Sequence, residues 1–200
     1  CIWDNGGTDT ISGESSTAGV EIDLRGATLT NSVGGGGYVS HFGSTAGYTI
    51  AYNSTGTCII ENATGSDYDD NLYGNSSDNT ISGGSGDDTL DGGYGDDILV
   101  GGSGTDTATY SSDLFQYTVW KGTNLIITDK TSDRDGEDQL SSIETVSFNG
   151  TSIDVSNIRT GMHISSSTYQ LIGDNGSKVL KRSASSSGLN DSSNRNWNVV

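Results

Sequence analysis

The 200-residue sequence contains no proline and only two cysteines, Cys1 and Cys58. It is also poor in basic residues, with 9 against 26 acidic ones and a formal net charge of −17. Without proline the chain differs from collagen-like and proline-rich sequences, whose stiffness depends on that residue. The negative charge would repel nucleic acid and anionic membrane surfaces, so no nucleic-acid partner is expected and cations are the natural ligands.

Apolar residues are scarce as well. They make up 30% of the chain, below the usual share for a compact globule, so a large apolar core is not expected. No apolar run is long enough to cross a bilayer, and membrane insertion is therefore not expected either. Glycine, by contrast, occurs 30 times, which indicates many turns.

Recognisable catalytic motifs are missing. With only two histidines, His41 and His163, the chain cannot form the HExxHxxGxxH zinc motif, and it has no GxSxG sequence. No signature places a base beside one of the many serines. We therefore expect that this chain is not an enzyme by itself, although a parent protein could be one.

Residues 65–109 divide without gaps into five blocks of nine: GSDYDDNLY, GNSSDNTIS, GGSGDDTLD, GGYGDDILV and GGSGTDTAT. An acidic or amide residue recurs at the sixth position and an apolar residue at the eighth. The sixth position holds Asp70, Asn79, Asp88, Asp97 and Asp106, and the eighth holds Leu72, Ile81, Leu90, Leu99 and Ala108.

A six-residue glycine-rich arc followed by three extended residues predicts a tight turn and a very short strand with one inward side chain. Two blocks would form one coil, and successive coils would stack with parallel strands about 4.8 Å apart. The sequence therefore predicts an all-β fold, a parallel β-roll. Asp70 should lie near Asp88, Asn79 near Asp97, and Asp88 near Asp106.

The repeats carry ten aspartates and no lysine or arginine. Calcium resolves this repulsion, because it binds about six to eight oxygens from carboxylates and from carbonyls that glycine can turn toward the ion. Zinc would need His or Cys, and magnesium a stricter octahedron. A flexible acidic linker would not keep the eighth position apolar in register. The predicted ligands, for three or more calcium ions, are Asp70, Asn79, Gly83, Gly84, Gly86, Asp88, Gly92, Gly93, Gly95, Asp97, Gly101, Gly102, Gly104 and Asp106.

The blocks resemble the RTX β-roll of bacterial proteins that leave the cell by type I secretion. The resemblance implies repeats that stay unfolded in the calcium-poor cytosol and fold outside the cell, with the type I secretion apparatus as a partner. The first two blocks depart from the pattern: Ser66, Tyr68, Asn75 and Ser77 replace glycines and Asn79 replaces aspartate. Sites that use these two blocks should therefore be weaker.

Upstream, IWDNGGTDT at 2–10, IDLR at 22–25, SVGG at 32–35 and IENA at 60–63 look like the C-terminal domain of serralysin-type metalloproteases. That resemblance implies a further calcium site formed by Asp4, Gly6, Gly7, Asp9 and Glu61. Strands that bring Asp4 to Glu61 would also bring Cys1 to Cys58, so a disulfide is one hypothesis and two unrelated thiols are the other.

Downstream of Thr109, FQYTVWKGTNLIITDKT and VSFNGTSIDV read as β-hairpins. We expect residues 110–160 to form a small antiparallel cap on the roll of residues 1–109, and residues 161–200 to be a β or irregular extension, the start of a further module or a secretion signal. DRDGEDQLSSIE, with Asp133, Asp135, Asp138 and Glu144, is interpreted as a solvated acidic turn in preference to another calcium site. The residues expected to cover the last coil are Phe115, Tyr117, Trp120, Ile126 and Phe148.

Together these features predict a calcium-binding module that gives calcium-dependent folding, stability and secretion competence to a larger secreted bacterial protein. Two alternatives remain open: a non-catalytic domain of a secreted serralysin-like metalloprotease or other hydrolase, and a spacer in a surface adhesin. Glycan recognition would rest only on Tyr117, Trp120 and Trp197, which core packing explains better.

Overall fold

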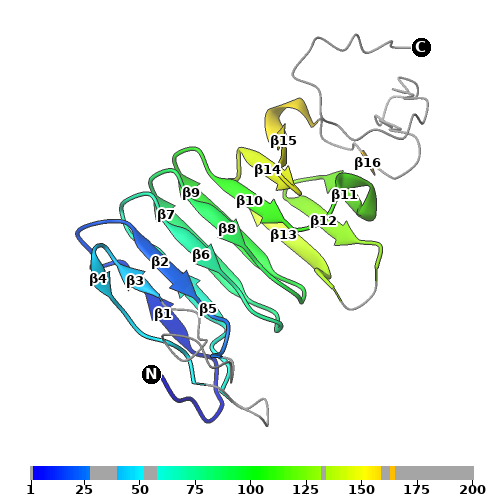
Figure 1. The fold of residues 1–200 in the computed structure, drawn as a ribbon. Helices are drawn as coiled ribbons and strands as arrows, with labels where there is room; N and C mark the ends of the chain where they lie inside the picture. The colour runs from blue at the N-terminus through cyan, green and yellow to red at the C-terminus, as the bar shows by residue number, and fades with distance from the viewer. Residues whose placement is uncertain (1, 28–39, 52–57, 132–133, 159–162, 165–200) are drawn as a thin grey trace, which may run out of the picture.

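The chain forms two facing β-sheets in the computed structural model, which describes residues 2–27, 40–51, 58–131, 134–158 and 163–164 (Figure 1). We name each sheet after one central strand. The β7 sheet has the order β1 (Thr10–Ser12), β5 (Asn62–Thr64), β7 (Thr80–Ser85), β9 (Ile98–Ser103), β13 (Glu137–Ser141), β12 (Leu125–Asp129), β11 (Tyr117–Lys121) and β16 (His163–Ile164). The β8 sheet has the order β15 (Thr151–Asp154), β14 (Thr145–Phe148), β10 (Thr107–Tyr110), β8 (Thr89–Asp91), β6 (Asn71–Tyr73), β2 (Val20–Asp23), β3 (His41–Phe42) and β4 (Thr45–Ala46).

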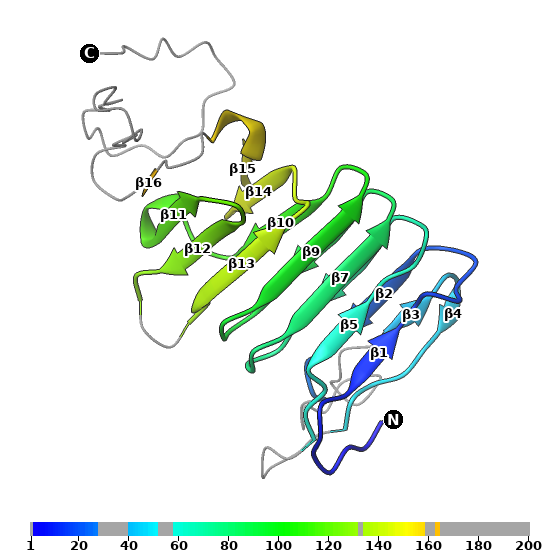
Figure 2. The same ribbon diagram turned by 180° about the vertical axis from the view of Figure 1, so that it is seen from behind.

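Consecutive strands of the repeat region alternate between the two sheets, so the chain winds as a coil (Figures 1 and 2). Within each sheet the neighbouring coils pair in parallel. Leu72 lies opposite Leu90 in one sheet, and Ile81 lies opposite Leu99 in the other. Each of these pairs joins residues two blocks apart in the sequence, which confirms the predicted parallel β-roll with two blocks per coil.

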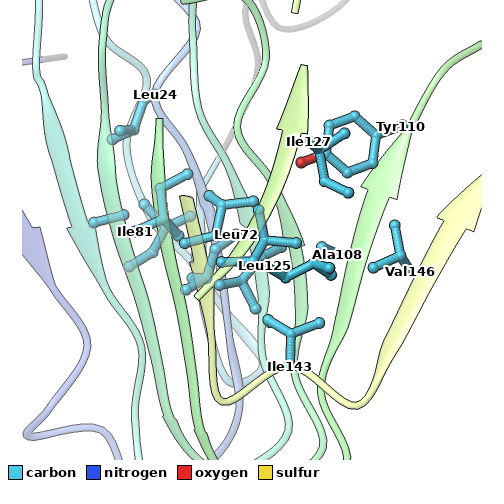
Figure 3. Close-up of a cluster of buried hydrophobic side chains, with 14 of the residues drawn as sticks. Leu24, Leu72, Ile81, Ala108, Tyr110, Leu125, Ile127, Ile143 and Val146 are labelled. Atoms are coloured by element: carbon cyan, nitrogen blue, oxygen red, sulfur yellow. The ribbon is translucent and has the colours of Figure 1, made fainter. Parts of the chain in front are cut away.

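The eighth-position side chains fill the space between the sheets. All five, from Leu72 to Ala108, have 0% exposed surface, and Figure 3 shows Leu72, Ile81 and Ala108 gathered there with Val146 from β14. Strand alternation directs one side chain of each three-residue strand inward. The core of the repeats is therefore a narrow column rather than a broad apolar layer.

The roll extends beyond the nonapeptides on both sides. β1 and β2 pair in parallel with β5 and β6, while β13 and β14 pair in parallel with β9 and β10. The hairpin β11–β12 lies between β10 and β13 in sequence and pairs antiparallel with β13, and β15 pairs antiparallel with β14. The 110–160 segment thus supplies the predicted antiparallel cap, and it also supplies one more parallel coil.

Two predicted cap contacts are wrong. Tyr117 and Phe148 are buried and pack against Tyr110, with ring centroids 5.2 and 5.3 Å from its ring. Phe115 and Trp120, however, are 44% and 46% exposed. Alternation along β11 explains Trp120, because Tyr117 points inward and residue 120 must then point outward. The remaining member of the predicted set, Ile126, is half-buried.

Within the described ranges, no helix is long and apolar enough to cross a membrane; the helical elements there are two single-turn 3-10 segments, Leu114–Gln116 and Val155–Asn157. The division of the chain at residues 109 and 160 stays a prediction. Apart from β16, the extension 161–200, which includes Trp197, lies outside the described residues, as does SVGG at 32–35.

Candidate metal centre

The glycine-rich arcs lie along two edges of the roll. We call the edge where the chain passes from the β7 sheet to the β8 sheet the first edge, and the opposite one the second edge. Asp70, Asp88 and Asp106 lie on the first edge, and Asn79 and Asp97 on the second. All five side chains are at most 2% exposed, so the strongly acidic repeats turn their sixth-position oxygens away from water.

Each of these side chains is held by the backbone of the preceding coil. Asp88 Oδ1 accepts a hydrogen bond from the Asp70 N–H at 2.9 Å, and Asp106 Oδ1 accepts one from the Asp88 N–H at 2.9 Å. On the second edge, Asp97 Oδ1 accepts from the Asn79 N–H at 2.7 Å. These bonds confirm the three predicted neighbour pairs and fix one oxygen of each carboxylate.

The second oxygen has no such partner. Oδ2 of Asp88, of Asp97 and of Asp106 is buried and makes no hydrogen bond to any described residue. Burial raises the pKa of the Asp88 and Asp97 carboxyls to about 7, and it also raises that of Asp106. A buried carboxylate with an unsatisfied oxygen is costly unless a cation or a proton compensates it.

Backbone carbonyls of the next coil lie near two of these oxygens, those of Asp88 and Asp106. A Cβ added to Gly83 would lie closer than 3.0 Å both to Asp88 Oδ2 and to the carbonyl oxygen of Gly101 in the next coil. Gly86 has φ of +111°, and its backbone lies close to the backbone of Tyr68 in the preceding coil. A side chain at this position would collide with Tyr68. Glycine at these positions therefore permits the close approach of carbonyl and carboxylate oxygens that calcium requires.

The first two blocks satisfy their sixth-position oxygens internally. Ser66 donates its N–H to Asp70 Oδ2 at 2.5 Å and its hydroxyl to Asp70 Oδ1 at 2.9 Å. Asn75 donates its N–H to Asn79 Oδ1 at 2.8 Å. Because these donors occupy the oxygens that are unpartnered in later blocks, they favour the prediction of weaker sites at the start of the repeats.

The other predicted repeat ligands are backbone positions. Gly84, Gly86, Gly93, Gly95, Gly102 and Gly104 all have positive φ, whereas Gly83, Gly92 and Gly101 lie beside the carboxylates of their own arcs. In the described part of the chain, no three His, Cys, Asp or Glu side chains are arranged to hold a metal ion by themselves. Calcium commonly takes part of its coordination shell from backbone carbonyls and water.

The predicted upstream residues also meet. Glu61 Oε2 accepts a hydrogen bond from the Asp9 N–H at 2.8 Å, and the Asp4 carboxylate accepts one from the Gly6 N–H. Asp9 Oδ2 is buried without a hydrogen-bond partner among the described residues, and Gly7 lies next to it. Burial, followed by the charge of Asp4, raises the pKa of Asp9. Asp9 and Glu61 lie on the second edge, in line with Asn79 and Asp97.

Cys58 is buried in the same region, where its Sγ accepts a hydrogen bond from the Asp4 N–H at 3.3 Å. Cys58 is a free thiol in the structure and donates to the Ile2 carbonyl oxygen at 3.7 Å. This favours the alternative of two unrelated thiols over the disulfide, although Cys1 lies outside the described residues.

Sequence reasoning missed a sixth block: part of the segment interpreted as a solvated acidic turn is buried. Asp135 and Asp138 are 5% and 1% exposed, and Asp138 Oδ1 accepts the Asp97 N–H at 2.9 Å, just as Asp97 accepts that of Asn79. The signal was present in DRDGEDQLS at 133–141, where Gly136, Asp138 and Leu140 occupy the fourth, sixth and eighth positions. Asp133 itself lies outside the described residues.

The sixth block differs from the third to fifth blocks at Oδ2 of its sixth-position aspartate, Asp138. The Tyr110 hydroxyl donates to Asp138 Oδ2 at 2.8 Å, so that oxygen has a protein partner. Burial, opposed in part by the backbone N–H of Asp97, raises the pKa of Asp138 to about 8. The Tyr110 hydroxyl therefore partners the oxygen of Asp138 that corresponds to the unpartnered Oδ2 of Asp97.

Comparison with known families agrees with this geometry. Residues 64–93 and 73–108 match the model of the RTX calcium-binding nonapeptide repeat, with four copies. No curated protein matches the chain, and the resemblance to serralysins is not supported by these comparisons. Repeats of this family form a structural calcium-binding module typical of secreted bacterial proteins. Residues 64–108 of this chain are therefore RTX calcium-binding nonapeptide repeats, wound into a β-roll.

Proposed function

We propose that the chain is a calcium-dependent folding module of a larger secreted bacterial protein, in which calcium ions between the arcs hold adjacent coils together. One observation carries the proposal: Oδ2 of Asp88, Asp97 and Asp106 is buried, unpartnered and next to the first glycine of its own arc. The oxygens that would hold the ions are those of the predicted repeat residues, with Asp4, Asp9 and Glu61 as a further group on the second edge.

Charge explains why the ions would be required for folding. Successive carboxylates on an edge are linked through a backbone N–H. Burial, and after it the charges of Asp70 and Asp106, raise the pKa of Asp88. No basic residue lies within the repeats. The narrow apolar column offers little to offset this repulsion, since each block buries one aliphatic side chain. Calcium would supply both the compensating charge and the crosslink.

The expected affinity makes calcium a switch between compartments. Extracellular calcium modules bind at roughly 0.1 to 1 mM, which the cell exterior supplies and the cytosol does not. The repeats would therefore stay unfolded inside the cell and fold after export. This behaviour is what the RTX resemblance implies for passage through a type I secretion apparatus. Catalysis, if the parent protein performs any, would reside in other segments.

A calcium titration tests the proposal. Far-UV circular dichroism of the chelated protein should show little strand signal, and calcium near the millimolar range should restore it. Magnesium is the control, because its octahedral preference and tightly held water suit these arcs poorly. A flat titration, or equal responses to both ions, would overturn the proposed function.

A further inference from the structure

Beyond the matched repeats, the first edge continues into the cap. By the register of β9 and β13, Ser141 pairs with Val100, which places Ser142 opposite Gly101. Glu144 then follows at the end of a turn that is shorter than the repeat arcs, immediately before β14. Its Oε2 accepts the Asp106 N–H at 2.8 Å, as Asp106 Oδ1 accepts the N–H of Asp88. Glu144 thus occupies the place of the next sixth-position carboxylate.

The oxygens around Gly101 repeat the arrangement found around Gly83. A Cβ on Gly101 would lie closer than 3.0 Å to Asp106 Oδ2 and to the Ser142 carbonyl oxygen, matching Asp88 Oδ2 and the Gly101 carbonyl at Gly83. Ser142 adopts φ of +49°, unusual for a residue other than glycine. Its carbonyl oxygen lies where the repeats present that of Gly101, although Gly101 itself has no positive φ.

Asp106 supplies an independent sign that a ligand belongs here. The residue is 0% exposed, and its Oδ2 has no hydrogen-bond partner among the described residues. The last carboxylate on the second edge, Asp138, differs, because its Oδ2 accepts a hydrogen bond from the Tyr110 hydroxyl. An open carboxylate oxygen, a carbonyl and a second carboxylate form an all-oxygen set suited to a hard divalent cation.

We propose that a calcium ion binds at this junction, held by Asp106 Oδ2, the Ser142 carbonyl oxygen and the Glu144 carboxylate, and fastens the cap to the last repeat. Two of the three ligands, Ser142 and Glu144, lie outside the family match. Because the 142–144 turn offers fewer carbonyls than a six-residue arc and Glu144 is exposed, water completes the shell and the site is weaker than those between repeats. The proposal deepens the proposed function and rests on it.

The test compares Glu144→Gln with Glu137→Gln in the whole chain. Both substitutions remove one negative charge from an exposed glutamate. Glu137, however, lies on the second-edge side of the roll, where its carboxylate accepts a hydrogen bond from the Thr128 hydroxyl at 3.2 Å. Glutamine at 144 can still accept the Asp106 N–H, so folding should survive. Isothermal titration with calcium should show one fewer ion per chain, or one site weakened at least tenfold, for Glu144→Gln alone. Hydrogen exchange of β14 in calcium should rise in the same variant.

Unchanged stoichiometry and affinity in Glu144→Gln, or the same loss in Glu137→Gln, would overturn the junction site. The two proposals fail differently. Absence of calcium binding by the wild-type chain would remove the proposed function. Calcium binding by the wild type that is unchanged in the Glu144→Gln variant would remove only the junction site. If Glu144→Gln does not fold, Glu144→Asp measured in the same way decides, because it keeps the charge and withdraws only the carboxylate at 144, whereas Asp106 also lies beside Asp88 in the repeats; a calcium site of unchanged affinity in that variant would overturn the junction site.

Discussion

Substitution of Asp88 by asparagine separates the metal role of this side chain from its backbone role. The amide oxygen of Asp88→Asn can keep the hydrogen bond from the Asp70 N–H, which Oδ1 accepts at 2.9 Å. The change therefore affects mainly Oδ2, the buried oxygen without a partner. Asp67→Asn is the matched control, because it makes the same chemical change at an exposed residue of the first block.

The size of the effect follows from the contact that is lost. A contact to a charged group contributes about 1.5 to 3 kcal/mol, and about 1.4 kcal/mol corresponds to a tenfold change in binding. The calcium concentration at the folding midpoint should therefore rise roughly tenfold to hundredfold in Asp88→Asn. Asp67→Asn should leave the midpoint almost unchanged.

Circular dichroism against calcium concentration measures both midpoints, and chelated samples add a second comparison. Without calcium, Asp88→Asn should be no less structured than the wild type, because it removes a buried charge and its amide can donate a hydrogen bond. Equal midpoints for Asp88→Asn and Asp67→Asn would refute the assignment of Asp88 Oδ2 to a shared ion. A variant that is less structured than the wild type in chelator would show that the charge itself supports the fold.

Three further predictions concern the roll. Burial raises the pKa of Asp88 and Asp97 from 3.8 to about 7, so the folded state binds more protons between these values and the stability of the calcium-free fold should fall as pH rises from about 4 to 7; a chelated sample with more strand signal at pH 8 than at pH 5 would contradict this. Gly86→Ala should destabilise the calcium-bound roll by about 1 to 3 kcal/mol, because of its φ of +111° and the nearby Tyr68 backbone; Gly150→Ala, which also has positive φ but open space, is the control for the steric part. Leu90→Ala removes a fully buried side chain and should lower the free energy of unfolding by about 2 to 5 kcal/mol in urea with saturating calcium; a loss below 1 kcal/mol would mean that the column contributes little.

The repeats were predictable because the nine-residue period fixes both the turn and the side of each strand. Once Leu90 points inward, the arc length places Asp88 and Asp106 on one edge, and no tertiary information is needed. The sixth block was missed because the hairpin β11–β12 interrupts the period and only Gly136, Asp138 and Leu140 keep it. Its burial depends on pairing with β9, a contact between distant segments that no local pattern reveals.

The cap was predicted less well for a related reason. Its hairpins follow from local alternation and turn residues, but the choice of inward face depends on what lies across the sheet. Grouping Tyr117 with Trp120 ignored that residues three apart on a strand face opposite sides. The upstream group formed by Asp4, Asp9 and Glu61 was located by resemblance to a known family, and its meeting in space depends on the parallel pairing of β1 with β5.

Both departures from the roll leave from the β8 sheet and return to the β7 sheet: one lies between β2 and β5, the other between β10 and β13. In the part of the chain that the structure describes, both insertions therefore lie on the second-edge side, while the first edge passes from coil to coil through short turns. A gene encoding such a protein could gain or shed whole hairpins on one flank without shifting any strand out of alignment. Among the described residues, the opposite flank carries no inserted hairpin.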